Sequence, residues 1–217
     1  MTRILIADDH AMVREGLRKV IEEQPGWVVC GEAANGREAV AKTRELKPDV
    51  LVLDIVMPEL NGLEVTRQVR AAWPQTEVLI LTMHESEQLA RAVLAAGAHG
   101  FVLKSDPGTT LVTAVEHLSR HRSFFTAKMS HLLPEDGELH PVVSAKEEKP
   151  PGDRLTARER EIVQLIAEGR GSKQVADALG ISVKTVDTHR TNLMRKLAIH
   201  SVSELVRYAI REGIAAP

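Results

Sequence analysis

The sequence predicts two folded domains: a doubly wound α/β domain with a five-stranded parallel sheet, and a second, all-α domain with a helix-turn-helix. Three observations support this fold class. Short apolar runs alternate with amphipathic segments through residues 1–121. A polar stretch with several prolines, predicted to be a flexible linker, follows at 122–152. From 153 to 217 the hydrophobic residues recur with the helical period.

The first domain contains five strand candidates, each rich in Val, Ile and Leu, as strands buried on both faces of a sheet are. They cover residues 3–7, 27–33, 49–53, 77–82 and 99–103. Amphipathic segments suited to helices follow them at 11–23, 36–46, 62–72, 86–96 and 108–121. Because each strand is followed by a helix, right-handed crossovers would give a parallel sheet, here expected in the order 2-1-3-4-5.

The second domain contains four expected helices joined by short turns. Thr156 and Glu159 match a capping box, in which each side chain satisfies a free amide at the helix start. Gly180 provides a tight turn between the second and third helices, and Ser182 is a candidate N-cap for the third. The helices are expected near 156–168, 173–179, 182–197 and 201–211. This arrangement is typical of a helix-turn-helix.

Composition and charge narrow the class of protein. No stretch approaches the roughly 18 consecutive apolar residues of a membrane span, and the N-terminus does not read as a secretion segment. The single cysteine, Cys30, excludes an internal disulfide and is interpreted as a small core residue. We therefore expect a cytoplasmic protein with no membrane partner.

The two ends of the chain differ in charge. Residues 1–122 carry 14 Lys and Arg against 17 Asp and Glu, a net charge of −3. Residues 153–217 carry 11 against 8, a net charge of +3. The change of sign favours a C-terminal domain that binds a polyanion such as double-stranded DNA.

Polar side chains follow four of the predicted strands at the ends that meet at one sheet edge. Asp8 and Asp9 follow the first strand, Asp54 the third, Thr82 ends the fourth and Lys104 follows the fifth. An aspartate carboxylate can attack phosphorus to form an acyl phosphate. A hard divalent cation, by default Mg²⁺, would offset the repulsion among the carboxylates. Lys104 and Thr82 would bind phosphoryl oxygens, so the edge predicts phosphorylation of Asp54.

The third helix of the second domain carries cations and short polar side chains, a combination that can enter the major groove of DNA. The candidates for phosphate contacts are Lys184, Arg190, Arg195 and Lys196. The candidates for base edges are Asp187, Thr188 and Thr191, with Thr185 in the same segment. Asp187 could accept a hydrogen from a cytosine amino group, or it could repel phosphate and sharpen specificity.

The first domain resembles the flavodoxin-like receiver domain of bacterial two-component response regulators over about residues 1–121. The residues that carry this resemblance are Asp8-Asp9, Asp54 with Pro58 and Gly62, Thr82 and Lys104. The resemblance implies that a histidine kinase phosphorylates Asp54. It also implies Mg²⁺ held by Asp9, Asp54 and the backbone carbonyl of Val56, with Asp8 helping. Phe101 stands where the family has its aromatic switch residue, often tyrosine, so that switching there proceeds without a ring hydroxyl.

The second domain looks like the LuxR-type output domain of NarL/FixJ-type regulators over about residues 153–213. The matching strings are Leu155-Thr156-Ala157-Arg158-Glu159 and Leu179-Gly180-Ile181-Ser182-Val183-Lys184-Thr185-Val186, with Lys196-Leu197. Ala157 stands where the family commonly has proline. The resemblance implies dimers on a two-fold symmetric operator, with the last helix contributing to the dimer.

The leading hypothesis is a transcription factor that binds its promoter as a homodimer when Asp54 is phosphorylated. It is not expected to be a turnover enzyme. A hydrolase that uses Asp54 as a phosphoenzyme nucleophile is one alternative, but Val56 stands where that chemistry would use a second aspartate. An adaptor whose C-terminal domain binds protein instead of DNA is the other alternative.

Overall fold

The computed structural model describes residues 1–83, 87–126 and 155–215. These residues form two compact units, an N-terminal α/β unit and a C-terminal helical unit. Within the described ranges, no helix is long and apolar enough to cross a lipid bilayer.

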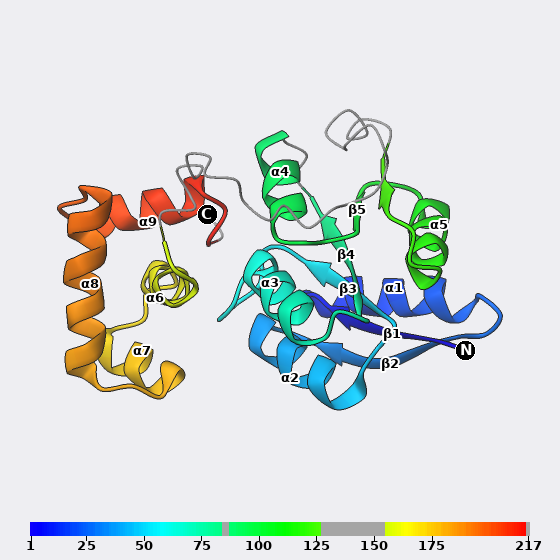
Figure 1. Ribbon diagram of the computed structural model, residues 1–217, viewed down its shortest axis with the longest axis horizontal. Coiled ribbons are helices and arrows are strands. Elements are labelled where there is room, and N and C mark those ends of the chain that lie inside the picture. The colour runs from blue at the N-terminus through cyan, green and yellow to red at the C-terminus, as the bar shows by residue number, and fades with distance from the viewer. Residues whose placement is uncertain (84–86, 127–154, 216–217) are drawn as a thin grey trace. The chain divides into compact units, whose positions relative to one another are not determined.

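A parallel sheet with the strand order β2-β1-β3-β4-β5-β6 forms the centre of the N-terminal unit (Figure 1). The strands are β1 (Thr2–Ala7), β2 (Trp27–Ala33), β3 (Val50–Asp54), β4 (Glu77–Thr82), β5 (Gly100–Leu103) and β6 (Phe124–Phe125). All five residues of β3 are buried, as its unbroken apolar run predicts. The doubly wound fold and the order 2-1-3-4-5 are confirmed, and a sixth strand is added.

The sixth strand, β6, lies within residues 122–152, for which we predicted a linker. It pairs with β5 in parallel, with Gly100 opposite Phe124 and Phe101 opposite Phe125. Phe124 packs against the apolar core of the sheet, and its ring lies edge-on to His117 with 5.5 Å between the ring centroids. Two adjacent phenylalanines therefore hold this short piece against the edge of the sheet. Residues 127–152 of the predicted linker lie outside the described residues.

Helices cover both faces of the sheet, with α1 and α5 on one face and α2 and α3 on the other (Figure 1). The helices of this unit are α1 (Ala11–Glu22), α2 (Gly36–Leu46), α3 (Gly62–Ala72), α4 (Glu87–Ala95) and α5 (Gly108–Ser119). Asn35 and Asn61 cap α2 and α3 through their side-chain oxygens, which fixes where these helices begin. Because every crossover returns the chain to the same sheet edge, the C-terminal ends of the strands lie together.

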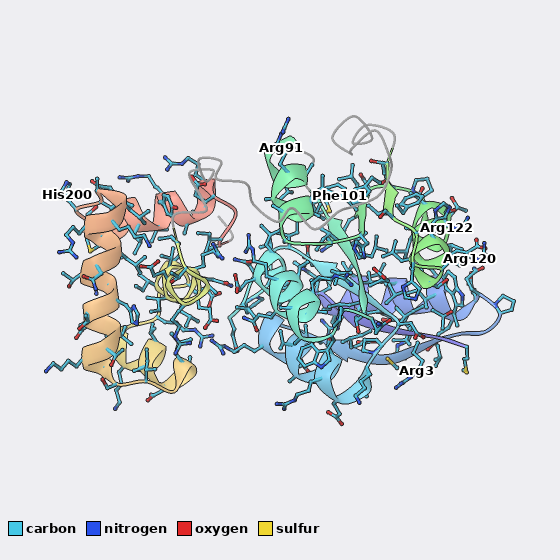
Figure 2. The ribbon with its side chains drawn as sticks, viewed as in Figure 1. Arg3, Arg91, Phe101, Arg120, Arg122 and His200 are labelled. Carbon is cyan, nitrogen blue, oxygen red and sulfur yellow. The ribbon has the colours of Figure 1, made fainter. Side chains whose placement is uncertain are left out.

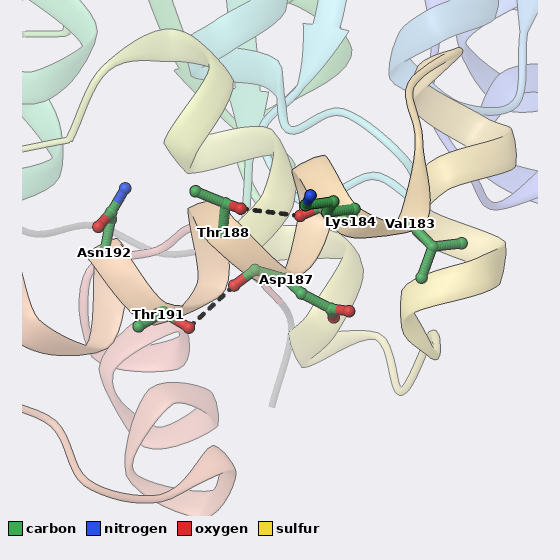
Figure 3. A pocket seen from close by; sticks show the side chains of 6 residues that line it. All are labelled: Val183, Lys184, Asp187, Thr188, Thr191 and Asn192. Atoms are coloured by element: carbon green, nitrogen blue, oxygen red, sulfur yellow. Dashed lines mark hydrogen bonds between the residues drawn. The ribbon is translucent and has the colours of Figure 1, made fainter.

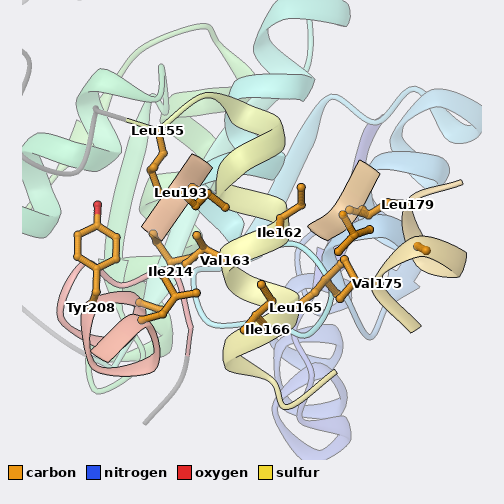
Figure 4. Packing of buried hydrophobic residues seen from close by; sticks show 14 residues of the cluster. Leu155, Ile162, Val163, Leu165, Ile166, Val175, Leu179, Leu193, Tyr208 and Ile214 are labelled. Atoms are coloured by element: carbon orange, nitrogen blue, oxygen red, sulfur yellow. The ribbon is translucent and has the colours of Figure 1, made fainter. Parts of the chain in front are cut away.

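The C-terminal unit consists of the helices α6 (Ala157–Ala167), α7 (Ser172–Leu179), α8 (Val183–Leu197) and α9 (Val202–Arg211). The predicted capping box of Thr156 and Glu159 opens α6. Gly180 ends α7 in the left-handed conformation, with φ of 63°, and Ser182 then caps α8. The apolar faces of these helices enclose one core around α6 (Figure 4). That core fixes the angle at which α7 and α8 meet and leaves the polar face of α8 exposed.

Candidate functional site

The buried carboxylates of Asp8 and Asp54 share one ammonium group, that of Lys104. The Nζ atom of Lys104 lies 2.7 Å from Asp54 Oδ2 and 2.6 Å from Asp8 Oδ2. Asp54 is 6% exposed and Asp8 only 1%. The three residues come from the ends of β3, β1 and β5, so the structure brings this part of the predicted site together.

The charges in this pocket do not balance, because two carboxylates face one ammonium. Burial, followed by the negative charge of Asp8, raises the pKa of Asp54 despite the hydrogen bond from Lys104. Burial alone would lower the pKa of Lys104, but its hydrogen bonds to Asp54 and Asp8 outweigh burial and raise it. A further cation would relieve this repulsion.

The loop that follows Asp54 is held by close backbone contacts. The Ile55 N–H donates to Asp54 Oδ1 at 2.8 Å, and the Gly62 N–H donates to the Ile55 carbonyl at 2.8 Å. A Cβ atom at Gly62 would lie 2.2 Å from the Asp54 carbonyl oxygen, so only glycine allows α3 to begin here. These contacts orient the Asp54 carboxylate before any ligand binds.

Thr82 and Lys104 lie at the ends of neighbouring strands. The Lys104 N–H donates to the Thr82 carbonyl at 2.8 Å, and Thr82 is 2% exposed. Phe101 lies on β5, three residues before Lys104, and is fully buried in the N-terminal unit (Figure 2). The roles predicted for Thr82 and Phe101 in switching stay predictions.

Asp8, Asp9 and His10 place one ligand atom each within 4.8 Å of one another. The Nδ1 atom of His10 lies 2.6 Å from Asp9 Oδ1. The buried Oδ2 atom of Asp8 pairs with the ammonium group of Lys104 at 2.6 Å. Carboxylate oxygens are the ligands that Mg²⁺ prefers, so Asp8 and Asp9 fit the cation, whereas the imidazole of His10 is not a preferred ligand.

The predicted magnesium site is only partly assembled by these contacts. Asp54 is joined to Asp8 through Lys104 and is not a member of the cluster around Asp9. Val56 is half-buried in the loop after Asp54, and the role of its carbonyl stays a prediction. His10 was not predicted from the sequence, where the available signal was its position directly after the two aspartates.

Helix α8 presents the residues predicted to contact DNA. Lys184, Thr185, Asp187, Thr188, Thr191, Arg195 and Lys196 are exposed, and Arg190 is half-buried. A shallow, open hollow of about 590 Å³ is lined by Val183, Lys184, Asp187, Thr188, Thr191 and Asn192 (Figure 3). Val183 and Asn192 were not predicted. Their helical spacing from Asp187 and Thr188 was the signal that could have revealed them.

The cations of α8 differ in how they are held. Lys196 pairs with Glu159 at 2.7 Å, and Arg195 donates to Asn192 at 3.2 Å. Lys184, by contrast, makes no ion pair within the described ranges. Lys184 is thus the cation most available to a phosphate group.

Thr185 has a structural role at the start of α8. Its N–H donates to Ser182 Oγ at 3.1 Å, and the two hydroxyl groups lie 2.8 Å apart. This contact is the N-terminal cap of the helix. The predicted DNA contact of Thr185 stays a prediction.

Both parts of the chain match known families. The model of the response regulator receiver domain matches residues 4–116. The model of the LuxR family of bacterial regulatory proteins matches residues 153–209. The oxygen regulatory proteins NreC of Staphylococcus haemolyticus (strain JCSC1435) and Staphylococcus carnosus (strain TM300) are each 39% identical to this chain over 213 residues, covering 98% of both chains.

Solved structures give the same picture. A LuxR family two-component response regulator from Aurantimonas sp. SI85-9A1 is 39% identical, with a TM-score of 0.58, and covers 60% of this chain and 94% of its own. RcsB from Salmonella enterica serovar Typhimurium, bound to the promoter rprA with the phosphomimetic BeF3−, is 27% identical with a TM-score of 0.59. That match covers 95% of this chain and 97% of the RcsB chain. A structure of two RcsB dimers bound to two parallel DNAs is also 27% identical, with a TM-score of 0.57, covering 95% and 96%.

Proposed function

Because this chain belongs to the LuxR family of two-component response regulators, a family of DNA-binding transcription regulators, we propose that phosphorylation of Asp54 controls its binding to a promoter. The observation that carries the proposal is the buried Asp54 carboxylate, paired with Lys104 at 2.7 Å and lying beside Asp8. The Asp54 carboxylate is therefore held in a fixed orientation, with the Lys104 ammonium beside it to pair with a phosphoryl oxygen and the Asp8 carboxylate close by.

The phosphoryl donor in this proposal is the phosphohistidine of a sensor histidine kinase. A carboxylate oxygen of Asp54 attacks phosphorus, the bond from phosphorus to the histidine nitrogen breaks, and an acyl phosphate forms on Asp54. Lys104 then pairs with a phosphoryl oxygen in place of the Asp54 carboxylate. The Thr82 hydroxyl donates to another phosphoryl oxygen, which draws the end of β4 toward the modified side chain.

The residues that would hold Mg²⁺ are Asp8, Asp9 and Asp54 with the carbonyl of Val56. A bound cation would supply positive charge that offsets the repulsion among the carboxylates and the phosphoryl group. The contribution of the chain is the placement of these oxygens. Burial and the negative charge of Asp8 raise the pKa of Asp54, so added positive charge would stabilise its ionised form.

Phosphorylation promotes DNA binding by shifting the equilibrium between two conformations of the protein. Phosphorylation shifts Thr82 and repacks the surroundings of Phe101, which favours a homodimer whose α8 helices bind two operator half-sites. The dimers that RcsB forms on DNA support this arrangement for a relative with the same two domains. Its DNA partner supports a cytoplasmic location.

We set the hydrolase alternative aside, because a turnover enzyme needs a general acid beside the phosphoaspartate and Val56 cannot serve as one. A LuxR-type domain also gives the modification a target to control, which a hydrolase does not need. We therefore propose that the protein does not catalyse the repeated hydrolysis of phosphate esters. An assay with an aryl phosphate substrate tests this, and it should show no sustained release of phosphate.

Phosphorylation is tested with a small-molecule phosphodonor and Mg²⁺. Intact-protein mass spectrometry should show one added phosphoryl group on the wild-type protein and none on Asp54→Asn. Asp49→Asn is the matched control, because Asp49 is an exposed aspartate immediately before the same strand, and this variant should be labelled like the wild type. Labelling of Asp54→Asn would overturn the assignment.

Control of DNA binding is tested with the same proteins on a genome-derived DNA library. The wild-type protein should retain specific fragments more tightly after phosphorylation, and Asp54→Asn should show no such gain. Equal binding before and after modification would show that Asp54 does not control the output.

A further inference from the structure

On the exposed face of α8 the carboxylate of Asp187 is held in place by a residue from another helix. The Ser172 hydroxyl, in the first turn of α7, donates to Asp187 Oδ1 at 2.8 Å. The other carboxylate oxygen, Oδ2, has no hydrogen bond within the described part of the chain. Asp187 therefore presents a fixed acceptor in the hollow of Figure 3.

The neighbouring hydroxyl groups are already used within the helix. Thr188 Oγ1 donates to the Lys184 carbonyl at 2.9 Å, and Thr191 Oγ1 donates to the Asp187 carbonyl at 3.0 Å (Figure 3). Both hydroxyl hydrogens thus already have a partner within the helix. With Val183 43% exposed, the surface around Asp187 presents methyl groups to a ligand.

The edges of the four bases in the major groove differ in how they meet a carboxylate. Guanine offers two acceptors, and thymine offers an acceptor and a methyl group, so neither can donate to Asp187. Adenine has an amino donor, but its N7 acceptor lies beside the donor and repels a carboxylate. Cytosine offers its amino group alone, which makes it the complement of an acceptor that has no donor of its own.

We infer that Asp187, positioned by Ser172, selects a cytosine in each operator half-site by accepting its amino hydrogen. This inference rests on the proposed role of α8 in the major groove. Asp187 lies near the N-terminal end of that helix, where recognition helices contact base edges. Ser172 is a positioning residue, because it reaches the base through Asp187.

A purely structural role for this pair must be distinguished from base reading. The N-cap residue of α7 is Gly171, which has no side chain to satisfy the free amides, so a nearby carboxylate could serve to stabilise that helix end. Loss of such a contact would lower the stability of the unit. It would leave the order of base preference unchanged.

The experiment selects binding sites for the phosphorylated full-length protein from randomised double-stranded DNA. The wild type should select a half-site with one cytosine, and Asp187→Asn should select adenine at that position, because an asparagine amide pairs with adenine. Ser172→Ala should keep cytosine but weaken the preference about tenfold. Asp177→Asn, an exposed aspartate on α7 outside the hollow, is the matched control and should select the wild-type site.

A second measurement needs no variant. N4-methylation of the selected cytosine keeps its pairing with guanine but replaces the amino hydrogen that faces the major groove. Binding of the wild-type protein should fall about tenfold, while N4-methylation of a cytosine outside the half-sites should have no effect.

The possible outcomes distinguish a failure of cytosine reading by Asp187 from a failure of DNA reading by α8 as a whole. If the wild type selects no sequence, the proposed DNA-reading role of α8 fails. If it selects an operator, but Asp187→Asn selects the same bases or the N4-methyl group costs nothing, Asp187 does not read cytosine. Should the variant fail to fold, the N4-methylcytosine measurement decides.

Discussion

Glu77, the first residue of β4, has a buried carboxylate at the sheet edge opposite Asp54. His99 and His121 both contact it through Nδ1, the latter at 2.8 Å from Oε1, and an Arg70 nitrogen lies 3.8 Å from Oε2. Burial alone would raise the pKa of Glu77, but the hydrogen bonds from the two histidines lower it below the ordinary value of 4.5. The ionised form of Glu77 therefore stabilises the folded state.

Glu77→Gln should lower the free energy of unfolding of the N-terminal unit by about 1–3 kcal/mol near neutral pH, because the amide weakens the bonds to both histidines. The pKa of Glu77 is lower in the folded than in the unfolded state. Its stabilisation is hence present above the unfolded pKa and is lost as the pH falls through the folded pKa. The difference between the variant and the wild type should shrink as the pH falls below 4.5.

Urea unfolding followed by tryptophan fluorescence measures this difference, since both tryptophans, Trp27 and Trp73, belong to the N-terminal unit. Glu116→Gln is the control, because Glu116 is an exposed residue whose pair with Arg120 contributes little. A destabilisation by Glu77→Gln that stays constant down to strongly acidic pH would contradict the assigned cause.

The sequence predicted where some of the functional residues lie in the structure and did not predict others. Asp54 and Lys104 were predictable, because strand ends of a parallel sheet must meet at one edge. The contact between Ser172 and Asp187 was not, since it depends on the angle at which two helices pack and no local pattern encodes that angle. The Glu77 cluster was missed because its partners lie far apart in the sequence: Arg70 in α3, His99 just before β5 and His121 just after α5.

Among the elements, the junction of β3 and α3 has the strictest steric requirement. Gly62→Ala should destabilise the N-terminal unit by about 1–3 kcal/mol, because its Cβ would lie 2.2 Å from the Asp54 carbonyl oxygen and 2.8 Å from Ile55 Cα. These are backbone atoms and cannot rotate away. Phosphorylation of Asp54 should slow as well, since α3 must shift from the end of the strand.

Gly16→Ala in α1 is the matched control for that substitution. A Cβ atom at Gly16 meets nothing within 4 Å, so alanine should stabilise the helix by about 0.5–1 kcal/mol. The urea midpoints of the two variants should move in opposite directions. A Gly62→Ala protein as stable as the wild type would contradict the close approach.

The element pattern was predictable where each segment carried its own signal. Apolar runs predicted the five long strands, and caps such as Thr156 and Ser182 predicted helix starts that the structure confirms. The short strand β6 was not predicted, because two residues show no periodicity and its pairing depends on the edge of β5. The surrounding polar composition instead favoured a linker at that point.

At the scale of the whole molecule, DNA binding should depend on salt through specific lysines. Lys184→Ala should weaken binding to all sequences, because each copy of the variant neutralises one DNA phosphate fewer. The slope of log affinity against log salt should therefore fall by about 1 for each such phosphate, and by about 2 in a dimer. Binding isotherms of the phosphorylated protein at several salt concentrations measure this slope.

Lys19→Ala is the control, because Lys19 lies in the N-terminal unit and pairs with Glu15. Its salt slope should equal that of the wild type. A Lys184→Ala protein with weaker binding but an unchanged slope would mean that Lys184 does not contact phosphate.

The pairing of Phe125 with Phe101 ties β6 to β5, the strand that leads to Lys104. Phe101 lies three residues before Lys104 on β5, and β6 is bonded to the same strand through the residues opposite Gly100 and Phe101. A displacement of β5 would therefore move β6 with it, because the two strands are joined at Gly100–Phe124 and Phe101–Phe125.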